Sequence, residues 1–159
     1  MENIVMQPIG TVHNEVAKGE GQVWAEVTSE LRLREGLEET LDGIEEFSHI
    51  VVLYYMHRTT PGQFPTKVHP RGRQDLPLVG VLATRHSTRP NSVGLTTARL
   101  LGREGLVLRV QGLDAFDGTP VLDIKPSMPG SDYPTQVTVP EWVKVIQAMP
   151  HRASGDAHR

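Results

Sequence analysis

The sequence predicts a mainly β fold in which an antiparallel β-barrel, or one heavily bent sheet, is accompanied by one or two short helices. Apolar runs rich in β-branched residues recur along the 159 residues, and short glycine-bearing connections separate them. Helical periodicity is confined to residues 35–44 and 139–149. Because many strands and few helices would leave sheet edges open, closure of the sheet is the arrangement that hides them.

The strands are predicted from alternating patterns and from continuous apolar runs. Residues 4–13 form the first, and residues 21–33 the second, since apolar and other side chains alternate from Gln22 to Val27. The run HIVVLYYMH at 49–57 is nearly all apolar, β-branched or aromatic, as expected of a central strand covered on both sides. Further strands are expected at residues 78–84, 93–101, 105–113 and 119–126.

The two helical stretches and one long connection complete the elements. In residues 35–44, Leu37, Leu41 and Ile44 recur at helical spacing among acidic residues, which predicts a short amphipathic helix. Residues 139–149 predict a C-terminal helix with one apolar face. Between them, residues 58–77 are rich in proline, glycine and basic side chains, so we expect a long loop of the kind that often carries function.

Length and composition predict one compact domain at residues 1–150 and a flexible C-terminal tail at 151–159. The chain has no cysteine, which excludes disulfides, zinc-thiolate sites and iron-sulfur clusters. The first residues lack the pattern of a signal peptide, and no apolar run approaches about eighteen residues, so a cytoplasmic protein without membrane contact is expected.

The charge balance limits the kind of partner. A formal net charge of −3 and a pI near 6.1 argue against a general nucleic-acid coat but allow a local basic patch. Any polyanion must therefore dock at one place on the surface.

The stretch RHSTRPNSVGL places two arginines four residues apart in a connection between apolar runs. Arg85 and Arg89 could clamp a carboxylate or phosphate through paired hydrogen bonds, because guanidinium is always charged and planar. Pro90 fixes a backbone angle, Asn91 can hydrogen-bond locally or to a ligand, and Gly94 permits close approach. The alternative from the residues alone is a turn with two solvated arginines.

The stretch GLDAFDGTPVLDIKP contains three carboxylates, Asp114, Asp117 and Asp123. Asp117 followed by glycine favours a hairpin tip, which is the simpler interpretation. Asp123, however, lies within an apolar strand and needs a partner or solvent, which Arg85, Arg89 or Lys125 could supply.

Two histidines, His49 and His57, bracket the central strand. Their even separation places both on one face, about 26 Å apart at the usual strand rise, so they cannot share a metal. No HExxH, HxH or CxxC pattern is present, and no metal site is predicted. The sequence also lacks GxGxxG, GxxxxGK[ST] and GxSxG, which removes the Rossmann, P-loop and hydrolase interpretations.

Four motifs together resemble a known family. PIGTVHNE, GIEEFSHIVVLYYMH, GVLATRHSTRPNSVGL and GLDAFDGTPVLDIKP follow one another between Pro8 and Pro126, in the order found in the TrmO (TsaA-like, YaeB) family of S-adenosylmethionine-dependent methyltransferases. The resemblance implies a single-sheeted antiparallel β-barrel that works as a homodimer. It also implies methylation of N6 of threonylcarbamoyladenosine in tRNA.

The resemblance implies a cofactor site at matching positions of this chain. Arginine suits the methionyl carboxylate of S-adenosylmethionine, and acidic groups suit its sulfonium or ribose hydroxyls. The implied cofactor-binding residues are Met56, His57, Arg58, Arg85, Arg89, Pro90, Asn91, Leu95, Leu113, Asp114 and Ala115.

The chain departs from the better-known bacterial members in two respects. Those members continue after the DIKP motif into a C-terminal domain implicated in tRNA binding, whereas this chain has one predicted helix there and ends at Arg159. The segment KGEGQVW stands where the family has a Pro-Arg-Gln-like cofactor contact. Two alternatives therefore stay open, a methyltransferase of a small metabolite and a non-catalytic S-adenosylmethionine-binding regulatory module.

Methyl transfer depends mainly on alignment and desolvation of the reacting atoms. A nitrogen acceptor would also benefit from a group that takes its proton, and the candidates for this catalytic role are His57 and Asp117. If tRNA is the acceptor, its contacts should gather in the long loop. The predicted substrate-binding residues are Lys67, His69, Arg71 and Arg73.

Overall fold

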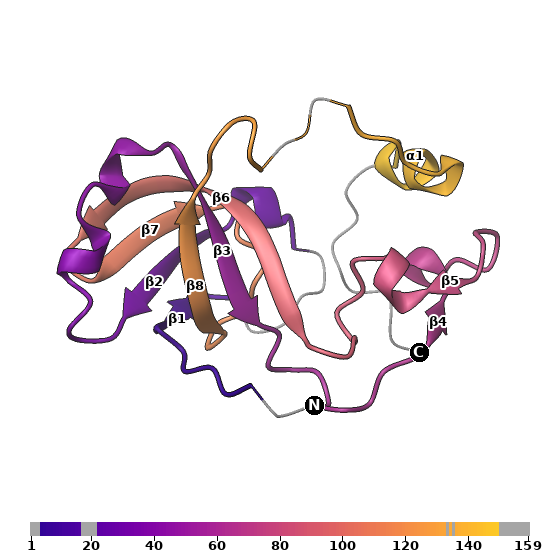
Figure 1. The fold of residues 1–159 in the computed structure, drawn as a ribbon, viewed down its shortest axis with the longest axis horizontal. Coiled ribbons are helices and arrows are strands. Elements are labelled where there is room, and N and C mark those ends of the chain that lie inside the picture. Colours follow the sequence, from indigo (N-terminus) through magenta and orange to yellow (C-terminus); the bar gives the residue numbers. More distant parts are fainter. Residues whose placement is uncertain (1–3, 17–21, 133, 135, 150–159) are drawn as a thin grey trace.

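Six antiparallel strands close into a barrel, which confirms the predicted fold class (Figure 1). The computed structural model describes residues 4–16, 22–132, 134 and 136–149. The strand order around the barrel is β1-β2-β7-β6-β3-β8. The bounds are Gly10–His13 for β1, Thr28–Leu33 for β2, His49–Tyr55 for β3, Val93–Glu104 for β6, Val107–Gln111 for β7 and Pro120–Pro126 for β8.

The core fills the barrel interior with side chains that alternate along each strand. Leu31 of β2 lies opposite Leu108 of β7, and both are fully buried. Strand β3 pairs with β6 on one side and with β8 on the other along most of its length. Its consecutive residues Ile50, Val51 and Val52 are all buried, so the expected cover on both faces holds around Val51 only, since His49 on the same outer face is exposed.

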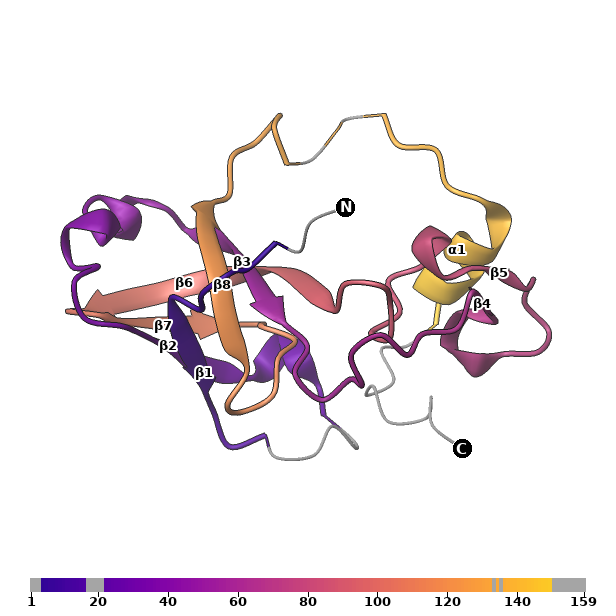
Figure 2. The ribbon, with the colours of Figure 1, turned by 60° about the horizontal axis from the view of Figure 1, so that its bottom comes forward.

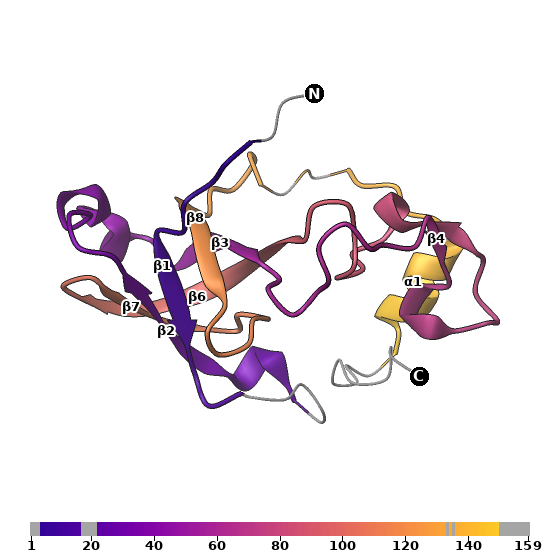
Figure 3. The ribbon, with the colours of Figure 1, turned by 90° about the horizontal axis from the view of Figure 1, so that it is seen from below.

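A smaller lobe stands to one side of the barrel in all three ribbon views (Figures 1, 2 and 3). Its helix lies beside the paired strands, and Arg73 Nη1 lies 3.1 Å from Met149 Sδ just beyond the helix. The predicted C-terminal helix is therefore confirmed, and it lies within the lobe beside its two strands. The lobe comprises β4 (Lys67–Val68), η4 (Pro70–Gly72), β5 (Val79–Gly80), η5 (Val81–Ala83) and α1 (Glu141–Gln147).

The predicted strand at residues 21–33 is wrong in its first half. Trp24–Glu26 form the 3-10 turn η1, and β2 begins only at Thr28. The Trp24 ring packs edge-on against Phe116, with ring centroids 5.4 Å apart. Aromatic packing against a distant segment here outweighs the local alternation.

The predicted helix at residues 35–44 is wrong, because this segment forms two 3-10 turns, η2 (Glu39–Leu41) and η3 (Ile44–Glu46). Gly36 and Gly43 adopt positive φ angles of 84° and 81°. These left-handed residues interrupt the right-handed backbone, and the stretch between them is too short for a stable α-helix.

The expected barrel strand at residues 78–84 is also wrong. This segment supplies only β5, which pairs with β4 outside the barrel, and then continues as η5. The barrel is already closed by six other strands, so it has no free edge for this segment. The expected loop at residues 58–77 consequently contains β4 and η4.

Two sequence predictions lie outside the described residues. They are the flexible tail at 151–159 and most of the KGEGQVW segment. Within the described ranges, no helix is both long and apolar enough to cross a membrane.

Candidate functional site

Arg85 and Leu95, two of the predicted cofactor residues, meet on the outer face of the barrel. The Arg85 Nη2 group donates a hydrogen bond to the Leu95 carbonyl oxygen at 2.7 Å. Both residues line a pocket of about 380 Å³, together with Val51, Thr97 and Asp132. The Leu95 side chain is 47% exposed beside it. A charged donor group and an apolar surface thus share one open pocket.

Asp114 lies within electrostatic reach of Arg85. Desolvation raises the pKa of the Asp114 carboxyl, and the positive charge of Arg85 lowers it in part. The flanking residues Leu113 and Ala115 are buried in the core, so this segment offers a ligand its backbone and the Asp114 carboxylate. The structure therefore brings Arg85 of the RHSTRPNSVGL stretch close to the segment at residues 113–115.

Tyr54 holds the Asp114 segment and was missed by sequence reasoning. Its hydroxyl donates to the Asp114 carbonyl oxygen at 2.6 Å, and Thr96 Oγ1 lies 3.2 Å from the same hydroxyl. Burial raises the pKa of Tyr54, so the phenol keeps its proton and remains a donor. The ring crosses Gly94 so closely that a Cβ there would lie 2.2 Å from Tyr54 Cε2. The signal in the sequence was a glycine inside a strand, which marks close approach.

The segment that follows β3 contacts the turn at 116–119. His57 Nδ1 lies 3.2 Å from Thr119 Oγ1, and the Arg58 guanidinium lies 4.2 Å from the centroid of the Phe116 ring. Desolvation, and then the charge of Arg58, lower the pKa of the His57 imidazole. A neutral imidazole at neutral pH is able to accept a proton. The Met56 amide donates to the Ser92 carbonyl at 2.8 Å, which ties this segment to the Pro90-Asn91 turn.

The two arginines of the RHSTRPN motif are held at different places. Arg89 Nη1 donates to the Thr84 carbonyl at 3.2 Å, whereas Arg85 donates to Leu95. Arg85 lines the pocket and Arg89 does not. Arg89 and the Asn91 carbonyl, which accepts from the Val93 amide at 2.7 Å, shape the loop around Arg85.

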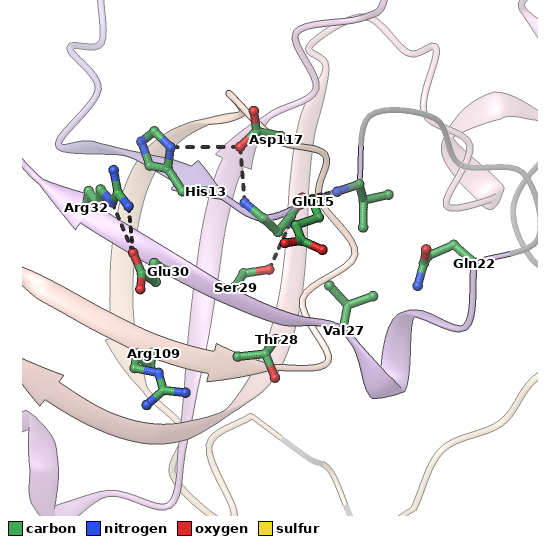
Figure 4. Close-up of a pocket in the computed structure, with 12 residues that line it drawn as sticks. His13, Glu15, Gln22, Val27, Thr28, Ser29, Glu30, Arg32, Arg109 and Asp117 are labelled. Atoms are coloured by element: carbon green, nitrogen blue, oxygen red, sulfur yellow. Dashed lines mark hydrogen bonds and ion pairs between the residues drawn. The ribbon is translucent and has the colours of Figure 1, made fainter.

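Asp117 lines a second hollow, of about 750 Å³, whose other lining residues include members of β1, β2 and β7 (Figure 4). Its Oδ1 accepts a hydrogen bond from the Asn14 amide at 3.1 Å and lies 3.8 Å from His13 Nδ1. The Gly118 amide donates to the Val12 carbonyl, so this turn is fastened to the end of β1. The two candidate bases, His57 and Asp117, thus flank one turn but face different surroundings.

The remaining polar predictions fall in the lobe and on β8. His69 Nδ1 lies 2.7 Å from the Leu76 carbonyl, and Arg73 is paired with Asp75. Lys67 and Arg71 have no ion partner among the described residues. Asp123 has the partner that the sequence offered, since Lys125 Nζ lies 2.6 Å from its Oδ2. In the described part of the chain no group of three or more His, Asp or Glu side chains could hold a metal ion.

Comparison with known proteins places these residues in a wider context. A model of the tRNA-methyltransferase O N-terminal domain matches residues 13–133. The chain is 42% identical over 102 residues to a tRNA (adenine(37)-N6)-methyltransferase of Mus musculus. The matched residues make up 64% of this chain and 23% of the mouse protein. It is 34% identical over 141 residues to a probable S-adenosyl-L-methionine-binding protein of Pyrococcus abyssi, covering 86% of this chain and 74% of that protein.

A solved structure has the same architecture. The crystal structure of TrmO from Pseudomonas aeruginosa superposes with a TM-score of 0.72 at 28% identity, covering 89% of this chain and 62% of that chain. The chain thus spans somewhat under two thirds of this structure and about a quarter of the mouse protein.

Proposed function

Because the chain belongs to the tRNA-methyltransferase O N-terminal domain family, we propose that it is an S-adenosylmethionine-dependent methyltransferase. Its proposed acceptor is N6 of threonylcarbamoyladenosine in tRNA. The observation that carries the proposal is that Arg85 and Leu95 line one open pocket, while Arg85 also interacts electrostatically with Asp114. The relative from Pyrococcus abyssi, which this chain matches over most of its length, is described as binding S-adenosyl-L-methionine.

The pocket chemistry suits the methyl donor. A guanidinium at Arg85 can bind the methionyl carboxylate through two hydrogen bonds, and the Asp114 carboxylate can attract the sulfonium or accept from ribose hydroxyls. The pocket volume of about 380 Å³ lies in the ordinary range for small-ligand sites.

The reaction forms a bond between the acceptor nitrogen and the methyl carbon as the bond from that carbon to sulfur breaks. The nitrogen must also lose its proton. His57 is the first candidate to receive it, because its lowered pKa keeps the ring neutral. Asp117 is the second candidate, although its Oδ1 already accepts from the Asn14 amide. Positioning of the two reactants supplies most of the rate in this proposal.

The charge distribution supports a polyanionic acceptor at the lobe. Residues 56–90 contain six Arg or Lys and one Asp, a local balance of +5. Residues 26–46 contain eight Asp or Glu and two Arg, a balance of −6. The turns at 39–46 and the lobe lie at opposite ends of the molecule (Figure 1). A tRNA would therefore be drawn toward the end that carries Lys67 and Arg71.

A cytoplasmic homodimer completes the proposal. The pocket is open on the barrel surface, and Val93 and Leu95 of β6 are 39% and 47% exposed beside it. A second copy packed over this face would cover both the apolar side chains and the bound cofactor.

Calorimetry with S-adenosylmethionine tests the donor. We expect Arg85→Ala to weaken binding by about ten- to a hundredfold, because a charge-assisted hydrogen bond contributes about 1.5 to 3 kcal/mol. Arg34→Ala is the control, since the Arg34 side chain is exposed and, among the described residues, hydrogen-bonds only to Gln7 Oε1, at 3.4 Å. Equal binding by wild type and Arg85→Ala would remove Arg85 from the cofactor site.

Methyl transfer from labelled donor to bulk tRNA, with or without threonylcarbamoylation, tests the acceptor. Lys67→Glu combined with Arg71→Glu should abolish transfer and leave cofactor affinity unchanged, because the two sites use different charges. If wild type binds the cofactor but leaves tRNA unmethylated, a small-metabolite acceptor replaces tRNA. If it transfers methyl to neither, the protein is a binding module.

A further inference from the structure

Three arginines lie on the outer face of three neighbouring strands, and we call them the arginine stripe: Arg32 on β2, Arg109 on β7 and Arg99 on β6. All three side chains are exposed, while the residues that alternate with them point into the core. Arg109 of β7 lies opposite Glu30 of the neighbouring strand β2. Arg99 pairs with Gln111, two residues from Arg109, so the two arginines are diagonal neighbours on one face.

The stripe has more positive charge than its neighbours neutralise. Glu30 accepts hydrogen bonds from Arg32 at 3.1 Å and 2.9 Å and is occupied by that pair. Neither the Arg99 nor the Arg109 side chain has a hydrogen bond or an ion pair with any described residue. Two like charges at diagonal positions of a sheet repel each other, and an anion bound between them would relieve the repulsion.

The stripe borders the 750 Å³ hollow without belonging to the cofactor pocket. Arg32 and Arg109 line this hollow, and none of its lining residues lines the pocket at Arg85. In Figure 4, Arg109 lies on one side of β2, and Glu15 and Asp117 lie on the other. On the side towards β7 the hollow is therefore lined by Arg109, with Glu30 of β2 opposite it.

We propose that Arg99 and Arg109 bind neighbouring phosphates of an RNA backbone, so that the acceptor contacts the barrel wall as well as the lobe. This inference rests on the proposed tRNA acceptor. Guanidinium matches the geometry of phosphate oxygens, and successive strands space the two cations along a line that a phosphate backbone can follow. The net charge of this chain is −3. Because most of its surface would repel RNA, its contacts with RNA must be concentrated in local cationic patches.

The test compares Arg99→Gln/Arg109→Gln with Lys125→Glu, since both variants lower the net charge by two. Lys125 lies on the outer face of β8, which β3 separates from β6, and is paired with Asp123. Bulk tRNA binding is followed by fluorescence anisotropy over a range of salt concentrations. For the stripe variant we expect affinity to fall about tenfold or more at 0.15 M salt, and the slope of log K against log salt to shrink by about two. Lys125→Glu should change both quantities much less.

A second variant and a stability measurement distinguish the loss of a phosphate contact from a loss of folding. Arg99→Lys/Arg109→Lys retains the charge and loses the paired hydrogen bonds, so it should retain most of the salt slope with weaker affinity. Thermal unfolding of all variants should match wild type, or rise slightly for the Gln pair because a repulsion is removed.

The outcomes separate this inference from the proposed function. If the stripe variant and Lys125→Glu lose affinity equally, or if neither loses any, the stripe is not an RNA contact. If wild type itself fails to bind tRNA, the stripe inference and the tRNA acceptor both fall. Cofactor affinity, measured with wild type and Arg85→Ala, then decides by itself whether the methyl-donor proposal survives.

Discussion

The barrel and the lobe hold their functional side chains in different ways. In the barrel, Tyr54 and the Asp114 segment are fixed by a core whose members include fully buried Leu31, Ile50 and Leu108. The lobe buries few side chains, with Pro70, Leu76 and Val81 below the surface and no buried residue in α1. Its cations are held by local contacts such as Arg73 with Asp75.

The proposed cofactor residues lie in or against the more rigid part of the molecule. Cofactor geometry in methyl transfer tolerates little displacement, and the residues proposed for it belong to or touch the closed barrel. The lobe exposes Leu78 and Leu82 by 53% and 70%, so its local opening should cost little free energy. A charged partner of variable shape is better served by such a surface.

The largest effect should follow from Gly94→Ala in the barrel. Its Cβ would lie 2.2 Å from the Tyr54 ring, and the ring cannot withdraw from a packed core. We expect a loss of about 2–3 kcal/mol in the free energy of unfolding, measured by urea denaturation. Gly80→Ala in the lobe is the matched control, since its nearest contact is 4.0 Å away and its φ is −59°. Similar losses for both variants would contradict the comparison.

Tyr54→Phe removes only a hydroxyl and should have the next largest effect. The Asp114 carbonyl would lose its donor, which costs about 1–2 kcal/mol of stability at a buried site. Because the Asp114 segment would also lose its orientation, S-adenosylmethionine affinity measured by calorimetry should fall. Tyr55→Phe on the same strand is the control, as the Tyr55 hydroxyl has no partner among the described residues. Unchanged affinity in Tyr54→Phe would show that this hydroxyl serves stability alone.

Arg71→Gly should stabilise the lobe slightly. Arg71 adopts φ 52° and ψ 29°, a left-handed conformation that is unfavourable for any side chain and natural for glycine. The relief is partly offset by the greater freedom of glycine in the unfolded chain, so a gain of about 0.5–1 kcal/mol is expected. Chemical denaturation measures the gain, and tRNA binding should weaken in the same variant. A less stable Arg71→Gly would show that this side chain is needed by the lobe itself.

The smallest expected effect is a pH dependence at Asp114. Its pKa is raised in the folded protein, so the folded state holds this proton more tightly than the unfolded chain does. Stability from this group is therefore lost as pH rises through the interval between the ordinary and the raised pKa. Asp114→Asn should raise the melting temperature at pH 7 and lose that advantage in acid below both pKa values. A melting temperature lowered at pH 7 would mean that attraction to Arg85 outweighs desolvation.

Local sequence patterns could predict two kinds of strand: those that pair with a strand close in the sequence, and those that are themselves strongly apolar. The run at 49–57 became β3 because almost any arrangement buries consecutive Ile50, Val51 and Val52. Residues 78–84 have a similar composition but could not join a barrel that other strands had closed. Trp24 left the predicted strand because Phe116, ninety-two positions later in the sequence, offered an aromatic contact.

The barrel class, the motifs that carry the family resemblance and the cation-rich segment could all be predicted from the sequence, because periodicity, residue type and charge are local properties. Which of those residues come into contact depends on the folded chain. It joined Arg85 to Leu95, placed Arg89 elsewhere and brought Tyr54 to Asp114, a residue sixty positions away. It also set Arg99 beside Arg109 through the pairing of β6 with β7. Such contacts depend on strand register and barrel closure, which arise from the packing of the whole chain.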